Sequence, residues 1–201
     1  TAAQVMAPFW QPAVADIVAC MRSTPCILTE SGKFVLPKAA LRRPVEVDSG
    51  LVHNTALRRS LGVEFVDSSM SEMAERLGCC EFGLQHLAEI IKGVVEDMSR
   101  ASPPRKLTLG LLALSLLFDG SSSLTTVELQ LWCEKLYVYI NIVLEPDDIE
   151  RILWELPIFP TTDCAGEESM ESLSRGTIFS SIDDEWLYLR GNCLRVLVEG
   201  V

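Results

Sequence analysis

The sequence predicts an α+β fold with a mainly helical centre and short β-hairpins at its two ends. Apolar residues recur at helical spacing between residues 54 and 156. Two apolar runs flank the polar turn Ser31–Gly32 near the start, and two more flank residues 190–192 near the end. We expect a single module over residues 1–201, with a candidate internal boundary near residues 100–106.

The first predicted elements are a short amphipathic helix and a hairpin. Pro12 suits the first turn of the helix, which should end before Pro25. The hairpin spans residues 26–36, and Pro37 closes it. Its turn at Ser31–Gly32 should be exposed, whereas the side chains of Ile27 and Phe34 should be buried.

Four helices are predicted in the first part of the helical centre. Asn54 is the expected N-cap of a helix that ends at Gly62, and Ser69 is the expected N-cap of another that ends at Gly78. A longer helix starts near Leu84 and stops before Pro103. The segment 107–118 is apolar almost all round, so it should be the most buried helix.

Thr125 and Glu128 have the spacing of a capping box, which predicts a helix from there to Pro146. A further helix is expected over residues 147–156. Strands are expected over residues 157–163, 176–180, 186–189 and 194–198, with a polar loop over residues 164–175. Ile158 and Phe159 should be buried. Residues 25–32 and 157–163 share a proline, an apolar run and a turn, which is a weak internal repeat.

Composition excludes several partners. The formal net charge of −11 opposes binding to nucleic acid or to an anionic membrane, because both need clustered Lys and Arg. We interpret the pairs Arg42–Arg43 and Arg58–Arg59 as solvated or ion-paired with nearby carboxylates. The longest apolar stretch, over residues 107–118, is shorter than the roughly 20 residues that span a bilayer.

The seven cysteines lack the C-x-x-C spacing of metal and redox sites. We expect free, largely buried thiols and therefore an intracellular protein. The neighbours Cys79 and Cys80 leave a redox or metal site as the alternative. The set is Cys20, Cys26, Cys79, Cys80, Cys133, Cys164 and Cys193.

No phosphate-binding glycine loop and no local catalytic signature occur in the sequence. We expect structural roles for His53 and His86. The acidic clusters at residues 147–150, 167–168 and 183–185 lack the pattern of a calcium loop, so we interpret them as helix-capping or solvated groups. The tryptophans should be core or interface anchors. We therefore predict no catalytic, cofactor-binding or metal-binding residue.

Several stretches resemble the plant NO VEIN-like family, whose large members, like sacsin, carry an ATPase domain of the gyrase, heat-shock chaperone, histidine kinase and MutL superfamily. The stretches are Arg22–Pro37, Met73–Gly83, the leucine-rich helix near Leu111, Leu156–Asp163 and Gly176–Phe179. The loop over residues 164–175 departs from the shorter family pattern. The resemblance implies a region that follows the ATPase domain, and none of the matching stretches is a catalytic motif.

The first functional hypothesis is therefore a non-catalytic interaction or regulatory module, cut from a longer polypeptide, that responds to an upstream ATPase domain. The second is a scaffold that docks in a large assembly. An enzymatic reading would need acidic residues together with His53 or His86. The resemblance also implies a protein partner and a nuclear location, with a cytoplasmic location as the alternative.

Overall fold

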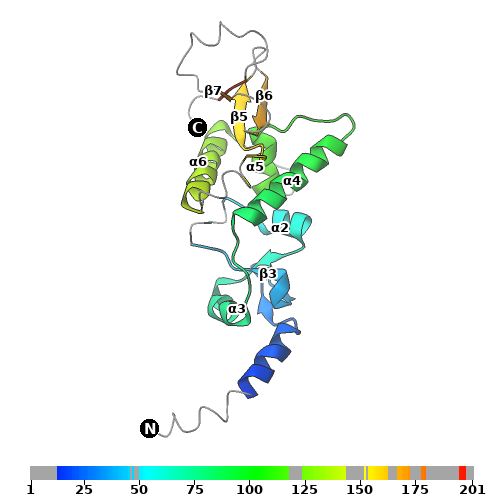
Figure 1. The fold of residues 1–201 in the computed structure, drawn as a ribbon, viewed down its shortest axis with the longest axis vertical. Coiled ribbons are helices and arrows are strands. Elements are labelled where there is room, and N and C mark those ends of the chain that lie inside the picture. The colour runs from blue at the N-terminus through cyan, green and yellow to red at the C-terminus, as the bar shows by residue number, and fades with distance from the viewer. Residues whose placement is uncertain are drawn as a thin grey trace. The chain divides into compact units, whose positions relative to one another are not determined.

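The computed structural model describes residues 13–45, 47, 50–117, 124–143, 152, 154–162 and 167–172, and the backbone of residues 178–179 and 195–197. The chain divides into two compact units. Unit 1 contains Thr1–Val45 and Gly62–Phe82, and unit 2 contains Glu46–Leu61 and Gly83–Val201. Helices fill the centre of the sequence and short strands lie toward both ends (Figure 1), so the predicted α+β class is confirmed. The single module over residues 1–201, with its boundary near 100–106, stays a prediction.

Unit 1 begins its sheet structure with the predicted hairpin. Strand β1 (Ile27–Leu28) pairs antiparallel with β2 (Phe34–Val35). The turn is exposed as predicted, and it is closed by a hydrogen bond of 2.8 Å from the N–H of Gly32 to the carbonyl of Thr29. Gly32 has a φ of 78°, which an L side chain rarely adopts.

The prediction that Ile27 and Phe34 of the hairpin are both buried is correct for the first residue and wrong for the second. Ile27 is fully buried, but Phe34 is 63% exposed. Side chains alternate between the two faces of a strand. Val35 packs against the core of unit 1, so the adjacent Phe34 lies on the opposite face of β2. Among the described residues of unit 1, no segment covers that second face of the two-stranded hairpin.

A parallel pair that the sequence analysis did not predict lies beside the hairpin. Strand β3 (Ala40–Leu41) pairs with β4 (Glu64–Phe65), and the 3-10 helix η1 (Pro37–Ala39) leads into β3. The carboxylate of the buried Glu64 accepts hydrogen bonds from the hydroxyls of Thr29, at 3.0 Å, and Ser31. The side chain of one strand thus holds the turn of the hairpin.

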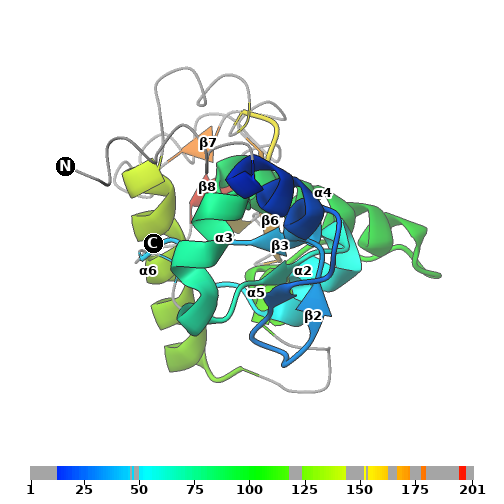
Figure 2. The same cartoon turned by 90° about the horizontal axis from the view of Figure 1, so that it is seen from below.

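Two helices complete unit 1. Residues 13–22 are helical as predicted, and α3 (Ser71–Leu77) lies beside them (Figure 2). The side-chain Nε of Arg22 donates to the carbonyl of Leu77 at 3.1 Å. The predicted N-cap Ser69 is wrong: the carboxylate of Asp67 accepts from the N–H of Ser69 at 3.0 Å and caps the 3-10 helix η2 (Ser68–Met70) that precedes α3.

The described residues of unit 2 form four helices, which are α2 (Asn54–Leu61), α4 (Leu84–Arg100), α5 (Leu109–Leu117) and α6 (Thr126–Val143). Among the described helices, α5 alone has no exposed residue. Residues of α5 lie close to the other three helices. The prediction that this segment is the most buried helix is right in that no residue of α5 is exposed, but the fraction of its residues that are buried is no higher than in α2 or α4.

Helix α6 begins with the predicted capping box. The N–H of Thr125 donates to the carboxylate of Glu128 at 2.8 Å, and the N–H of Glu128 donates back to the Thr125 hydroxyl at 3.3 Å. One face of α6 is buried. On this face the indole Nε1 of Trp132 donates to the carbonyl of Leu51 at 3.1 Å, so this tryptophan is a core anchor.

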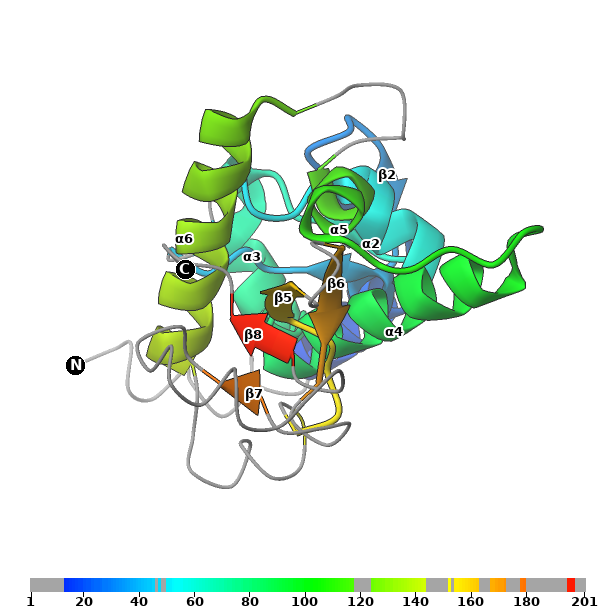
Figure 3. The ribbon, with the colours of Figure 1, turned by 90° about the horizontal axis from the view of Figure 1, so that it is seen from above.

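A four-stranded sheet has the order β6-β5-β8-β7 (Figure 3). Its strands are β5 (Phe159–Thr162), β6 (Glu168–Glu171), β7 (Ile178–Phe179) and β8 (Arg195–Leu197). Strands β5 and β6 form an antiparallel hairpin, and β8 is antiparallel to β5 and parallel to β7. The expected strand over residues 186–189 lies outside the described residues.

Two predictions near the sheet, the polar loop over residues 164–175 and the buried Phe159, are corrected. Strand β6 occupies part of the segment predicted as a polar loop, because its backbone pairs with β5 whatever its side chains are. The helix predicted over residues 147–156 lies largely outside the described residues, and Trp154 and Glu155 form a turn. Ile158 is buried as predicted, whereas Phe159 is only half-buried.

Candidate functional site

Both histidines of the chain act at the start of a helix. The Nδ1 atom of His53 accepts from the N–H of Thr55 at 3.2 Å, and its carbonyl accepts from the N–H of Ala56. His53 therefore caps α2, and the predicted cap Asn54 is instead the first helical residue, with its side chain buried. Nδ1 of His86 accepts from the N–H of Gly83 at 3.1 Å.

Burial lowers the pKa of His86, and the nearby Glu89 carboxylate opposes this shift. A neutral imidazole is the form that can accept at Nδ1. These hydrogen bonds support the structural role expected for both histidines.

The first basic pair makes ion pairs, as expected. The guanidinium of Arg42 lies 3.2 Å from the Glu81 carboxylate, and that of Arg43 lies 2.9 Å from Glu30. Arg43 also stacks over the ring of Phe65, with its central carbon 3.6 Å from the ring centroid. Arg59 of the second pair donates to the carbonyl of Ser115 at 3.3 Å.

The five cysteines in the described part of the chain are free thiols. Cys79 and Cys133 are buried, and burial raises the pKa of both, to about 11 for Cys133. Cys20 and Cys80 are exposed, which corrects the expectation of buried thiols for these two residues. Cys164 and Cys193 lie outside the described residues.

The acidic clusters show no metal-site geometry where they can be seen. Glu167 pairs with Lys106 at 2.6 Å. Within the described residues, no three His, Cys, Asp or Glu side chains converge in a way that could hold a metal ion. The clusters at residues 147–150 and 183–185 lie outside this part of the chain.

Unit 2 contains a pocket of about 460 Å³ between helix α4, the segment that follows it, and the edge strand β6. Its apolar lining comes from four separate stretches of sequence: Val95 and Met98 of α4, Leu107 and Pro157 of two connecting segments, and Met170 of β6. Leu107 and Met170 are buried, and the other three side chains are half-buried. This volume lies within the range of small-molecule sites.

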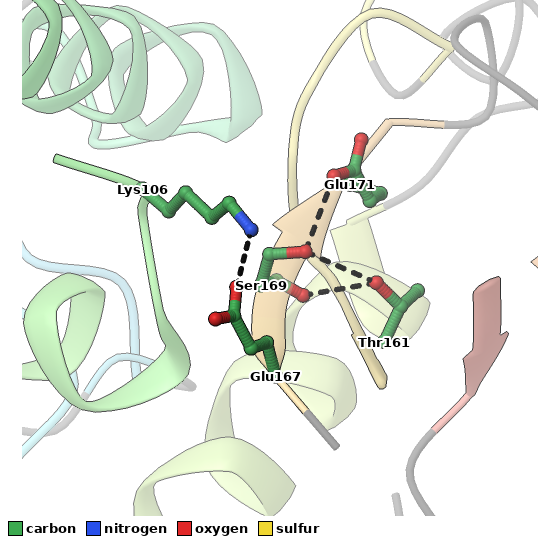
Figure 4. Close-up of polar contacts among 5 residues, drawn as sticks. All are labelled: Lys106, Thr161, Glu167, Ser169 and Glu171. Atoms are coloured by element: carbon green, nitrogen blue, oxygen red, sulfur yellow. Dashed lines mark hydrogen bonds and ion pairs between the residues drawn. The ribbon is translucent and has the colours of Figure 1, made fainter. Parts of the chain in front are cut away.

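The pocket is held by hydrogen bonds between its walls. The N–H of Arg105 donates to the carbonyl of Met98 at 3.2 Å, and the N–H of Met170 donates to the carbonyl of Leu107 at 2.7 Å. Figure 4 shows the β6 side of the site, where Lys106 reaches Glu167 and the hydroxyl of Ser169 donates to the carboxylate of Glu171 at 3.2 Å. These hydrogen bonds connect α4 to the segment that follows it, and that segment to β6.

Helix α6 presents a second candidate site, an apolar stripe on its exposed face. The four side chains of this stripe are each more than half exposed: Val127, Leu131, Val138 and Ile142. Their spacings of four, seven and four residues place them within an arc of about 60° on the helix. Exposed Glu134 and Lys135 lie on its two sides.

Comparison with family models, curated proteins and solved structures finds no match to this chain. The resemblance to the NO VEIN-like family therefore stays a prediction. In the part of the chain that the structure describes, every helix is too short or too polar to cross a bilayer.

Neither candidate site was predicted from the sequence. The sequence does contain a local signal for the α6 stripe. Apolar residues at positions 127, 131, 138 and 142 share one face of the helix, while Trp132 and Leu136 share the opposite face, so both faces are apolar and only one of them is buried. The pocket had no such signal, since its lining residues are separated by dozens of positions in the sequence.

Proposed function

We propose that this chain is a non-catalytic protein-interaction module, and that the apolar stripe of α6 is its docking face. The observation that carries the proposal is the exposure of four large apolar side chains on one face of a helix whose other face is buried. An aligned apolar stripe of this kind is a common feature of surfaces that bind another protein.

The stripe fits an amphipathic helix of the partner. Four apolar side chains over about four helical turns match the anchors that a partner helix places at positions i, i+4 and i+7. Glu134 and Lys135 flank the stripe with opposite charges, so a partner helix with a basic and an acidic flank on the corresponding sides would pair with both. The family resemblance makes an upstream ATPase domain of the same polypeptide the partner to test first.

Site-specific photo-crosslinking tests this proposal in the full-length polypeptide. A photoreactive amino acid at Val138 should crosslink to one defined helical segment of the upstream domain, identified by mass spectrometry. The same amino acid at Gln130, which is exposed on another face of α6, should not. L131D should reduce the Val138 crosslink at least about tenfold, whereas the matched variant Q130D should leave it unchanged.

Two other outcomes would contradict this assignment. A crosslink of equal yield from both positions would show that the stripe is not a specific face. A crosslink to a different polypeptide that co-purifies in fixed stoichiometry would support the scaffold hypothesis instead.

The non-catalytic part of the proposal has its own test. The isolated chain should show neither Mg-ATP binding by calorimetry nor phosphate release, since both histidines accept backbone N–H groups at helix starts and the net charge is −11. Turnover that one Glu or Asp substitution within the chain abolishes would refute it.

A further inference from the structure

Some of the charged side chains that line the pocket in unit 2 form ion pairs, whereas two of the lining cations form none. Three cations line it, and Lys106 is engaged by Glu167. Among the described residues, the side chains of Lys92 and Arg105 make no hydrogen bond or ion pair, and both are exposed. Two positive charges are therefore available beside an apolar lining.

The anionic side chains of the pocket are mostly occupied. Glu96 pairs with Arg100 at 2.8 Å, and Glu171 accepts the hydroxyl of Ser169. Glu155 alone among the three lining carboxylates has no polar partner in the described part of the chain. The Ser169 hydroxyl is neutral and does not cancel the charge of Glu171, so what distinguishes the pocket is the pair of cations Lys92 and Arg105 and not a net positive charge.

From these features we infer that the pocket binds an amphipathic carboxylate, that is, a small molecule with an apolar body and one anionic head. The apolar body contacts Met98, Leu107 and Met170, and the carboxylate pairs with Arg105 and Lys92. A guanidinium can bind a carboxylate through two parallel hydrogen bonds, which makes Arg105 the primary contact. The proposal is independent of the α6 docking face, which has no residue in the pocket.

Linear carboxylates provide the probes. Decanoate should bind the 201-residue chain and shift the methyl NMR signals of Met98 and Met170, which line the pocket, while those of Met70 and Met73 in unit 1 stay in place. Because each additional buried CH₂ strengthens binding about fourfold, decanoate should bind about 15-fold more tightly than octanoate. Decanol and decyltrimethylammonium should each bind at least fivefold more weakly than decanoate.

Two variants separate the charge from the fold. R105Q and K92Q should each weaken decanoate binding by about fivefold or more, and both change exposed side chains, so the variants should fold normally. K38Q, which neutralises an exposed lysine in unit 1, is the matched control and should bind decanoate as the original chain does.

Each contrary result overturns the inference. Affinity that does not depend on chain length would show that the apolar lining is not used. Binding of decyltrimethylammonium as tight as that of decanoate would assign the pocket to cations through Glu155. Equal decanoate affinity in R105Q, K92Q and K38Q would exclude the two cations as the site of the carboxylate.

Discussion

Two leucines on opposite faces of α6 give the sharpest test of the fold and of the docking face together. Leu136 has no exposed surface, whereas Leu131 is 53% exposed. The substitution Leu136→Ala should lower the free energy of unfolding by about 2–5 kcal/mol, because it removes buried methyl groups and leaves a cavity. Leu131→Ala should cost less than about 1 kcal/mol, since only about half of its side chain is out of water.

Urea unfolding measures the change in the free energy of unfolding for each variant. Amide hydrogen exchange within α6 shows whether the loss of stability occurs in unit 2, which contains this helix. The denaturant dependence should be the same in both variants, so that the midpoints alone report the difference. Alanine has the highest helix propensity in both positions, and helix formation therefore does not separate the two variants.

Equal destabilisation of the two variants would refute the reasoning. A loss above 2 kcal/mol in Leu131→Ala would mean that the stripe is covered within the chain itself, which would refute the α6 docking face. A loss below 1 kcal/mol in Leu136→Ala would mean that the buried face of α6 is wrongly assigned.

Three further results are expected. Tyr137→Phe should cost about 1–2 kcal/mol in urea unfolding, because the Tyr137 hydroxyl donates to the carbonyl of the buried Ile158 at 2.6 Å; no loss would show that this carbonyl has another donor. Hydrogen bonds from Thr125 lower the pKa of Glu128 in the folded protein. The stabilising effect of the Glu128 carboxylate should therefore be full above the usual glutamate pKa and be lost as the pH falls toward the lowered pKa of the folded protein. E128Q should remove this part of the acid dependence of stability, and an unchanged pH profile would contradict the assignment. Alkylation of the native protein should be fast at Cys20 and slow at Cys133, which is buried and has a raised pKa; equal rates measured by mass spectrometry would contradict the burial.

Local signals in the sequence predicted local structure well. The spacing of Thr125 and Glu128 predicted the start of α6 because the two residues satisfy each other's backbone N–H groups. Ser31–Gly32 predicted the hairpin turn, since Gly32 supplies a positive φ. In these cases the residues that decide the structure lie within a few positions of one another.

Structure that depends on distant partners was missed. Strands β3 and β4 pair residues more than twenty positions apart, and nothing in Ala40–Leu41 indicates its partner. Strand β6 has the polar sequence Glu-Ser-Met-Glu, and it forms because β5 pairs with one edge and the carbonyl of Leu107 accepts from the other. The pocket combines both problems, because its walls exist only after these distant segments have met.

Helix caps were predicted by type but not always by residue. Asp67 and Ser69 are both common cap residues, and the choice between them depends on where the backbone leaves its extended conformation. His53 is a cap that the sequence did not indicate, because histidine is not among the preferred N-cap residues. The helix starts were nevertheless placed within a few residues.

The two imidazoles that cap helices have a use beyond stability. Since Nδ1 accepts a backbone N–H in each ring, the proton of the neutral ring is fixed on Nε2, and ¹⁵N spectroscopy distinguishes the two tautomers directly. The sequence has no other histidine. A spectrum of the ¹⁵N-enriched protein with two ring systems therefore reports separately on the beginning of α2 and the beginning of α4, without any substitution or attached probe.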